Sequence, residues 1–208
     1  MDSNEVRQEW AQRSGKYSPD YYADYGPSRT SELLGWILDY FLDRDAAVLE
    51  VGCSSGRHLA HLREQGYENL HGVEINEEAL DVMAETYPDL AADGTFHAEA
   101  VEDVVEEFDD DRFDAVYTVE TLELVPPESE WVFEELARVA DDLLITVENE
   151  GEDDRRTEEI PVDYVDGEFP LYYRAWDDIF GELGFTDIYS KPAEMDTLRV
   201  FRPAEYYS

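Results

Sequence analysis

The amino-acid sequence predicts an α/β fold built on a parallel β-sheet, and two observations support this. First, short strand-like apolar segments alternate with helix-like segments over residues 46–147. Strands separated by helices of roughly 10–15 residues form parallel sheets with right-handed crossovers. Second, 208 residues with 43% hydrophobic and 13% aromatic side chains suffice for one domain with a sizeable core, and they argue against a fully disordered chain.

The expected elements follow one another closely from residue 28 onward. Apolar residues between Ser28 and Asp43 recur at helical spacing, so we expect a helix there with Ser28 or Thr30 near its N-cap. A short acidic helical turn is expected after the third strand. The five strands are expected at Ala46–Val51, Leu70–Glu74, Thr95–Ala98, Phe113–Val119 and Leu143–Val147. The helices between them are expected at Gly56–Gln65, Glu77–Thr86 and Glu130–Ala140.

The pattern changes after residue 150. Residues 149–170 are polar and contain several glycines and prolines, so we expect a long loop or lid there. A helix over Arg174–Leu183 and two strand-like pieces, around Ile188–Ser190 and Thr197–Phe201, are consistent with a hairpin at the sheet edge. We therefore divide a single domain, 1–208, into an N-terminal helical cap (1–45), a core (46–150) and a C-terminal loop and hairpin (151–208).

The charge of the chain is its most unusual property. Asp and Glu number 53 and Lys and Arg 15, giving a net charge of −38, and only Lys16 and Lys191 are lysines. Carboxylates spread along a chain hold water and stay soluble in concentrated salt, where screening acts over only ~3 Å at 1 M. We therefore expect a cytoplasmic protein of an extreme halophile, with an acidic protein of a non-halophile as the alternative. Non-specific binding to nucleic acids or anionic membranes is disfavoured.

The single cysteine, Cys53, excludes an internal disulfide and a cysteine-based zinc cluster. The sequence contains no run of ~18 apolar residues, so no transmembrane helix is expected. The first ten residues are polar and acidic, which argues against a signal peptide. No metal is expected, and a soluble, intracellular protein is the resulting prediction.

The stretch Val48–Leu59 carries the strongest chemical signal. A buried strand runs directly into the small residues Gly52 to Gly56 and then into a helix, an arrangement in which backbone N–H groups approach a ligand closely. The spacing Gly-x-x-x-Gly differs from that of dinucleotide-binding proteins, and Glu50 would repel a pyrophosphate but bind an ammonium group. Glu74 ends the next strand, where a carboxylate can hold both hydroxyls of a ribose.

Five segments, in the correct order, resemble motifs of class I S-adenosylmethionine-dependent methyltransferases. These segments are Glu50–Gly56, Gly72–Asn76, Phe113–Leu122, Glu135–Val139 and Trp176–Phe185. The resemblance implies a Rossmann-like fold with a seven-stranded, mostly parallel sheet, helices on both faces and an antiparallel edge strand. It also implies S-adenosyl-L-methionine as cofactor and S-adenosyl-L-homocysteine as product. With the charge, it suggests a member of the family from a halophilic archaeon.

The resemblance also implies roles for individual residues. Glu50 and Gly52 would contact the methionine part of the cofactor, and Glu74 would hold the ribose hydroxyls. Residues around the adenine and the sulfonium would come from the ends of the second, third and fourth strands. The complete set of implied cofactor-binding residues is Glu50, Gly52, Cys53, Ser54, Gly56, Glu74, Ile75, Ala100, Val101, Thr118, Val119 and Glu120.

Two positions depart from the family pattern. Ala100 stands where relatives often have an aspartate that accepts the adenine amine, so Glu99 or Glu102 would have to substitute. Leu124 stands where some relatives have a histidine that could act as a base. No catalytic residue is therefore assigned. Methyl transfer can still proceed largely by positioning, because the sulfonium is already a good leaving group and proximity supplies ~7–11 kcal/mol in favourable cases.

Candidate acceptor contacts come from the two ends of the chain, where aromatic side chains could form an apolar pocket with a few polar groups. They are Tyr21, Tyr22, Tyr25, Arg29, Tyr173 and Arg174. The expected function is methyl transfer to an oxygen, nitrogen or carbon atom of a small molecule. The acceptor, the oligomeric state (a homodimer included) and any movement of residues 149–170 are left open.

Three alternatives remain. A protein or RNA methyltransferase is disfavoured by the absence of a separate RNA-binding module. A non-catalytic cofactor-binding or partner protein with the same fold is mildly favoured by Leu124 and Ala100. A nicotinamide-dependent dehydrogenase is disfavoured by Glu50 and the glycine spacing.

Overall fold

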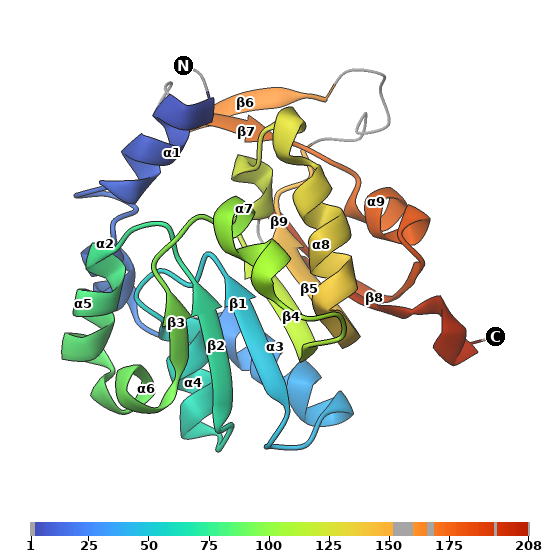
Figure 1. The fold of residues 1–208 in the computed structure, drawn as a ribbon, viewed down its shortest axis with the longest axis horizontal. Coiled ribbons are helices and arrows are strands. Elements are labelled where there is room, and N and C mark those ends of the chain that lie inside the picture. The colour runs from blue at the N-terminus through green and yellow to red at the C-terminus, as the bar shows by residue number, and fades with distance from the viewer. Residues whose placement is uncertain (1–2, 152–159, 166–168, 194, 208) are drawn as a thin grey trace.

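The computed structural model describes residues 3–151, 160–165, 169–193 and 195–207. Its centre is a seven-stranded sheet with the order β3-β2-β1-β4-β5-β9-β8 (Figure 1). The strands are β1 (Ala47–Val51), β2 (Asn69–Val73), β3 (Thr95–His97), β4 (Phe113–Val119), β5 (Ala140–Glu148), β8 (Phe185–Ala193) and β9 (Asp196–Pro203). The predicted α/β class is confirmed.

The strand directions place the candidate site. Strands β1 to β5 pair in parallel, whereas β9 is antiparallel to both β5 and β8. The one antiparallel strand therefore lies one position in from the edge, and β8 and β9 form the predicted hairpin. Strand β1 has β2 on one side and β4 on the other, so the chain reverses its winding there. Ligands of open α/β sheets bind at the carboxyl ends of the strands at such a point.

Helices cover both faces of the sheet (Figure 1). On the face turned toward the viewer lie α7 (Val101–Val104), α8 (Trp131–Val139) and α9 (Trp176–Glu182). On the opposite face lie α3 (Arg29–Phe41) and α4 (Arg57–Glu64). At the β3 end of the sheet lie α5 (Glu78–Thr86) and α6 (Pro88–Asp93). Short 3-10 turns span Val105–Glu107, Leu122–Leu124, Pro127–Ser129 and Ala204–Tyr207.

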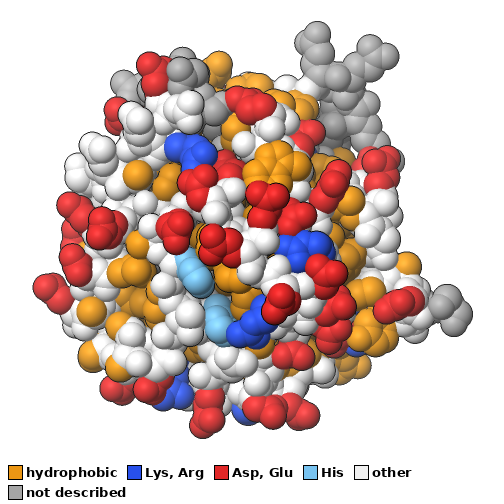
Figure 2. Space-filling view, viewed as in Figure 1, with side chains coloured by type: hydrophobic (Ala, Val, Ile, Leu, Met, Phe, Trp, Pro, Cys, Tyr) orange, Lys and Arg blue, Asp and Glu red, His pale blue; other side chains and the backbone are white. Residues whose placement is uncertain are grey.

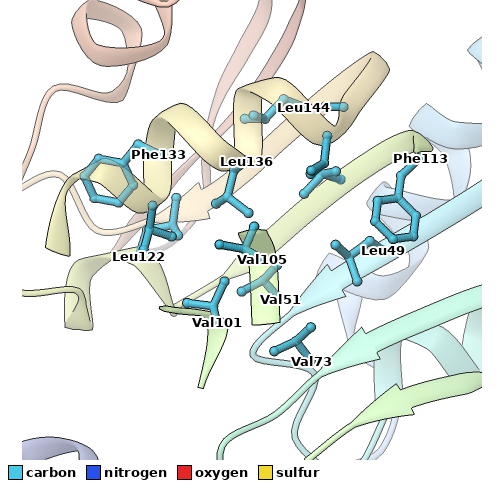
Figure 3. Close-up of a cluster of buried hydrophobic side chains, with 14 of the residues drawn as sticks. Leu49, Val51, Val73, Val101, Val105, Phe113, Leu122, Phe133, Leu136 and Leu144 are labelled. Carbon is cyan, nitrogen blue, oxygen red and sulfur yellow. The ribbon is translucent and has the colours of Figure 1, made fainter. Parts of the chain in front are cut away.

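Each face of the sheet has its own apolar cluster, because successive side chains of a strand point to opposite faces. Leu49 and Val51 of β1 pack with Phe133 and Leu136 of α8 in the cluster that Figure 3 shows. Val48, between them in the pleat, belongs to the cluster under α3 and α4. Burial of these side chains is the main force that holds the layers together.

The N-terminal helices and a segment that follows β5 lie at the carboxyl side of the sheet. Helix α1 (Ser3–Ala11) lies beside a small hairpin of β6 (Val162–Val165) and β7 (Phe169–Tyr172) at the top of Figure 1. The rings of Trp10 and Phe169 are 5.4 Å apart between centroids, which joins α1 to β7. Helix α2 (Pro19–Tyr25) leads from there to α3.

The prediction of a loop over residues 149–170 is wrong where the structure describes β6 and the start of β7. These strands pair with each other rather than with the main sheet, so the long apolar runs typical of buried strands are missing from their sequence. Residues 152–159 and 166–168 of the expected loop lie outside the described residues.

Most predicted boundaries agree with the structure within one or two residues. Ser28 is the N-cap of α3, as expected: its hydroxyl accepts from the Thr30 N–H, and the Ser31 hydroxyl reaches back to the Ser28 N–H. Helix α6 was not predicted. Pro88 occupies its first turn, where a missing N–H costs nothing, so this proline starts a second helix as well as ending the first.

Acidic side chains are spread over the whole face shown in Figure 2, and Lys and Arg form only small isolated patches there. Several arginines are ion-paired, among them Arg44 with Asp39 and Arg63 with Asp93. Within the described residues, no helix has both the length and the apolar character needed to cross a bilayer.

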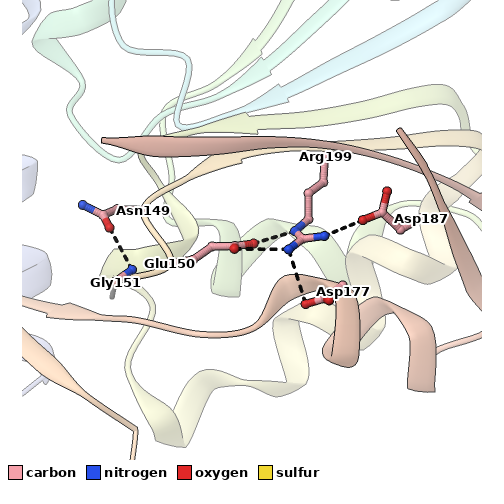
Figure 4. A network of polar contacts seen from close by, with 6 residues as sticks. All are labelled: Asn149, Glu150, Gly151, Asp177, Asp187 and Arg199. Carbon is pink, nitrogen blue, oxygen red and sulfur yellow. Dashed lines mark hydrogen bonds and ion pairs between the residues drawn. The ribbon is translucent and has the colours of Figure 1, made fainter. Parts of the chain in front are cut away.

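A buried charge cluster ties the C-terminal hairpin to the end of β5 (Figure 4). The Arg199 guanidinium of β9 donates to both carboxylate oxygens of Glu150, at 2.6 and 3.2 Å, and also pairs with Asp177 and Asp187. Glu150 is only 3% exposed. Removing one partner of a buried ion pair leaves the other charge in an apolar environment, which costs more than the pair itself contributes.

We therefore expect Arg199→Ala to lower the free energy of unfolding by about 3–5 kcal/mol. Arg63→Ala, which breaks an exposed ion pair, should lower it by less than about 1 kcal/mol. Urea unfolding of both variants at one fixed salt concentration measures the difference. Equal effects of the two substitutions would contradict the assignment of Arg199 as the centre of a buried cluster.

Candidate functional site

A cavity of about 180 Å³ opens at the carboxyl ends of β1, β2 and β4. Its floor is the turn after β1, and α1, the loop before α2, β7 and the loop after β4 contribute the other walls. The lining residues include Val6, Arg7, Trp10, Arg13, Tyr17, Tyr22, Glu50, Gly52, Cys53, Ser54, Arg57, His58, Glu74, Ile75, Asn76, Glu99, Ala100, Val101, Glu102, Val119, Glu120, Thr121, Leu124, Val125, Pro126, Pro170 and Tyr172.

The floor of the cavity requires glycine at two positions. Gly52 has φ +75°, and a Cβ there would lie 2.2 Å from the Thr121 Oγ1. Gly56 has φ +81°, and a Cβ would lie 2.8 Å from the Met83 side chain. Both conformations are strained for L-residues with a side chain. The turn can therefore form only with glycine at these two positions. Its own N–H groups hold it in place: those of Gly52 and Cys53 donate to the Val73 carbonyl oxygen, and that of Gly56 donates to the Cys53 carbonyl oxygen.

Glu50 is a buried carboxyl group at the end of β1, only 1% exposed. Its Oε2 accepts a hydrogen bond of 2.9 Å from the Tyr117 hydroxyl on the neighbouring strand. Burial raises the pKa of Glu50 to about 8, although the Tyr117 hydrogen bond and the Arg57 charge oppose the shift. A cationic group bound in the cavity would lower this pKa again, because it stabilises the ionised form.

Glu74 follows β2 and is held by two backbone groups. Its Oε2 accepts from the Ser54 N–H at 2.8 Å, and its Oε1 accepts from the Asn76 N–H at 2.9 Å. Burial raises the pKa of Glu74, and these N–H groups oppose that shift. Each oxygen keeps a second lone pair, so a carboxylate fixed in this way can accept from two neighbouring hydroxyls of a ligand.

The structure brings most of the predicted cofactor residues together around this one cavity. Those that line it are Glu50, Gly52, Cys53, Ser54, Glu74, Ile75, Ala100, Val101, Val119 and Glu120. Gly56 lies in the turn behind the lining, and Thr118 is 1% exposed within the sheet. Glu99 and Glu102, proposed as substitutes for the missing aspartate at Ala100, also line the cavity.

Of the residues predicted to contact the acceptor, one lines the cavity and the others do not. Tyr22 lines the cavity, whereas Tyr21, Tyr25, Arg29 and Tyr173 are not among its lining residues. The neighbour of Tyr173 in sequence, Tyr172, takes that place in the wall.

Arg174 also lies away from the cavity, and it is 4% exposed. Its guanidinium donates to the Glu130 carboxylate at 3.0 Å and to the Val125 carbonyl oxygen at 2.8 Å. These bonds hold the loop after β4 against the residues that follow β7, so the side chain is engaged within the protein.

Sequence reasoning missed the wall that α1 and β7 provide. Val6, Arg7, Trp10 and Arg13 line the cavity from the N-terminal side, and Pro170 lines it from β7. The signal was weak because α1 is short and mostly polar. The four-residue spacing of Val6 and Trp10, which places both side chains on one helix face, could have revealed it.

The loop after β4 is held from the neighbouring strand. Glu148, at the end of β5, is fully buried, and its Oε2 accepts from the N–H groups of Thr121 and Leu122 at 2.9 and 3.1 Å. Glu120 has φ +50°, a conformation that non-glycine residues seldom adopt and that often marks functional sites. Leu124 lines the cavity with an aliphatic side chain that cannot accept a proton.

The described residues contain no group of three or more side chains arranged to hold a metal ion. Cys53 is buried, and burial raises the pKa of its thiol well above the usual range. A thiol in this state is a poor nucleophile. The chemistry available at the site is therefore that of carboxylates, backbone N–H groups, arginines and aromatic rings.

Comparison with known proteins agrees with this geometry. Residues 48–142 match the sequence family described as a methyltransferase domain. No sequence among the curated proteins matches the chain significantly.

Three solved structures illustrate the likeness in fold. The 1,6-didemethyltoxoflavin N1-methyltransferase of Burkholderia thailandensis, with bound S-adenosylhomocysteine, has 19% identity and a TM-score of 0.65 over 84% of this chain and 78% of that chain. The magnesium protoporphyrin IX methyltransferase of Synechocystis, with bound S-adenosylmethionine, has 17% identity and a TM-score of 0.67 over 97% and 96%. A protein of Pyrococcus horikoshii, provisionally assigned as an RNA methyltransferase, has 16% identity and a TM-score of 0.63 over 98% of this chain and 97% of that chain.

At these identities the solved structures establish the fold, which is the Rossmann-like fold of methyltransferases. The match of residues 48–142 adds the domain type, that of a methyltransferase, and supports an enzyme.

We expect the Cys53 thiol to react with the Ellman reagent only after unfolding, because it is 2% exposed and its thiolate is disfavoured. Absorbance at pH 8 with and without denaturant measures this. Fast labelling of the native protein would show that the floor of the cavity opens readily.

Proposed function

We propose that this protein transfers the methyl group of S-adenosylmethionine to an oxygen, nitrogen or carbon atom of a small molecule. One observation carries the proposal. Two carboxyl groups, the buried Glu50 and the half-buried Glu74, stand at the ends of adjacent strands, Gly52 begins the turn between them, and all three residues line one cavity.

The residues present fit the polar groups of this cofactor. Glu50 is buried with one hydrogen bond and forms no ion pair within the described residues, and the ammonium group of the methionine tail would supply a partner. Glu74 is held by two N–H groups in a position to accept from both ribose hydroxyls. Ile75 and Val101 offer apolar contacts to the adenine, and Glu120 places a carboxylate at the end of β4 for the sulfonium.

The other half of the cavity suits a small acceptor. Val6 and Trp10 of α1, Leu124 and Pro126 after β4, and Tyr172 at the end of β7 are all lining residues, and they make this wall mainly apolar. A cavity covered by a helix and a hairpin restricts access for a protein chain or a folded RNA. The two small-molecule methyltransferases of similar fold support the same assignment.

The reaction would rely on positioning. S-adenosylmethionine supplies a methyl group on a positively charged sulfur. Glu50 would hold the methionine tail and Glu74 the ribose, and the remaining, mainly apolar wall would receive the acceptor. Because Leu124 cannot take a proton, the acceptor atom would be nucleophilic as bound or lose its proton to solvent. Exclusion of water by α1 and β7 strengthens the electrostatic contacts.

The charge of the chain supports two finer parts of the proposal, adaptation to concentrated salt and a cytoplasmic location. A net charge of −38 with two lysines favours a protein adapted to concentrated salt in a halophile's cytoplasm. The sequence pattern supports a third part of the proposal, the division of one domain into a helical cap (1–45), a cofactor-binding core (46–150) and a C-terminal part (151–208).

The first test of the function is turnover in molar potassium chloride. Purified protein, S-adenosylmethionine and a panel of small phenols, amines and carboxylic acids should yield S-adenosylhomocysteine with at least one acceptor, measured by mass spectrometry. Tight cofactor binding without turnover on any small molecule, peptide or RNA would support a non-catalytic binding protein instead.

We expect Glu74→Ala to weaken S-adenosylhomocysteine binding by about 1.5–3 kcal/mol, the usual contribution of hydrogen bonds to a charged group. Calorimetric titration measures it. Glu77→Ala is a matched control, because Glu77 lies nearby in sequence but does not line the cavity. Unchanged affinity in Glu74→Ala would remove Glu74 from the site.

Binding of S-adenosylhomocysteine should release protons at Glu50. In the free protein its pKa is raised to about 8, and the ligand's ammonium would lower it, so affinity should rise with pH up to about 8 and level off above that. Calorimetry in buffers of different ionisation enthalpy counts the protons. Glu50→Gln, which cannot ionise, should abolish the release at Glu50, whereas release that persists unchanged would show that another group is responsible.

A further inference from the structure

Arg57 is a cation that lacks an acidic partner in a very acidic protein. It lines the cavity, and within the described residues no carboxylate forms an ion pair with it. Its guanidinium lies over the rings of Tyr22 and Tyr25, at 4.8 and 5.7 Å from their centroids. The rings fix the position of the guanidinium through cation–π contact and leave its N–H groups available.

The position of Arg57 in its helix is also unfavourable by itself. It is the first residue of α4 (Arg57–Glu64), and the N-terminal end of a helix already carries partial positive charge. The N-cap, Gly56, provides no side chain to accept from the first N–H groups. The Arg57 guanidinium and the N-terminal end of α4 therefore both place positive charge at one edge of the cavity, and an anionic ligand would stabilise this arrangement.

His58 provides a second, independent indication. It is 4% exposed and lines the same cavity. Its Nδ1 lies 2.8 Å from the Ser31 hydroxyl, which also accepts from the Ser28 N–H. His58 Nδ1 is the partner to which the Ser31 hydroxyl can donate its single proton, and in that arrangement the neutral ring carries its own proton on Nε2.

The His58 Nε2 is buried and has no hydrogen-bond partner among the described residues. Burial, helped by the charge of Arg57, lowers the pKa of His58 to about 3, so the ring is neutral at ordinary pH. An N–H donor buried without an acceptor costs about 1–3 kcal/mol. A ligand atom that accepts from it would recover that cost.

We propose that Arg57 and His58, at the N-terminal end of α4, form an anion subsite that binds a carboxylate of a ligand in this cavity. The guanidinium offers two parallel N–H groups, which match the two oxygens of a carboxylate. The subsite supplies one full positive charge and one neutral donor. Glu50, Glu74 and Glu120 line the same cavity and would repel a doubly charged phosphate.

The carboxylate has two possible sources. If the proposed function is correct, the methionine tail of the cofactor carries one, and Arg57 and His58 would hold it while Glu50 holds the neighbouring ammonium group. An acceptor that is itself a carboxylic acid could supply the other. The two sources are distinguished with 5′-methylthioadenosine, which has the nucleoside and the sulfur of S-adenosylhomocysteine but no amino-acid tail.

The test is calorimetric titration of both nucleosides into the wild type, Arg57→Ala and Arg63→Ala. Arg63 is a matched control in the same helix, with an exposed ion pair to Asp93. Potassium chloride is kept at the lowest concentration that preserves the circular-dichroism spectrum, because chloride competes for an anion site. Benzoate, a simple aromatic carboxylate, is titrated separately into the nucleoside-saturated proteins.

If the cofactor is the source, Arg57→Ala should weaken S-adenosylhomocysteine binding about ten-fold or more and leave 5′-methylthioadenosine binding unchanged. If the acceptor is the source, neither affinity changes, and benzoate binds the wild type and Arg63→Ala but not Arg57→Ala. Equal behaviour of all three proteins toward every ligand overturns the subsite. Failure of the wild type to bind either nucleoside contradicts the proposed function, and the benzoate titration of the free protein then still tests the subsite.

A second readout does not depend on the variants. The Nε2 signal of His58 in ¹⁵N NMR spectra should shift when the carboxylate-bearing ligand binds, and 5′-methylthioadenosine should leave it in place. A His58 signal that no carboxylate moves would contradict the role of His58, including the case in which Arg57→Ala does not fold.

Discussion

Carboxylates that accept from backbone N–H groups at the carboxyl edge of the sheet are the constraint on which the rest of the site depends. Glu74, after β2, accepts from the Ser54 N–H in the turn after β1. Glu148, at the end of β5, accepts from the Thr121 and Leu122 N–H groups in the loop after β4. In both cases an acid at one strand end fixes the loop that follows the neighbouring strand. Each loop loses this support if its carboxylate is removed, and both loops line the cavity.

Glu50 differs from these two acids, because no loop uses it. Its hydrogen bond comes from Tyr117 within the sheet, and its burial raises the pKa to about 8. The fold therefore carries a destabilised carboxyl group at the point where β1 meets the glycine turn. A site with an uncompensated buried acid is suited to a cationic ligand, since ligand binding then relieves a cost that the free protein bears.

The charge of the protein surface differs from the charge of the cavity lining. Acidic side chains cover all parts of the face in Figure 2, a distribution that affects how the protein interacts with its solvent. Inside the cavity Arg7, Arg13 and Arg57 are lining residues, although the chain has few cations. The site thus combines groups for ammonium, hydroxyl and carboxylate functions, which are the polar groups of an amino-acid-bearing nucleoside.

The sequence was sufficient for the elements whose signal is local. Val48 to Gly56 combines a short apolar strand with a turn that only glycine permits, and the structure places Glu50, Gly52 and Glu74 around one cavity as expected. The wall of the cavity formed by α1 and β7 could not be predicted in the same way. Trp10 meets Phe169, 159 positions later, through a contact between rings that no periodicity records. Arg174 was predicted to face a ligand, but its partners Glu130 and Val125 are known only once the loop after β4 is placed.

A crystal structure of the protein with S-adenosylhomocysteine tests the central claim most directly, through the distances from the Glu50 and Glu74 carboxylates to the ligand. We predict both ribose hydroxyls within about 3 Å of the Glu74 carboxylate and the ammonium nitrogen at a similar distance from Glu50. A ligand bound elsewhere, or one in this cavity with its ribose away from Glu74, would contradict it.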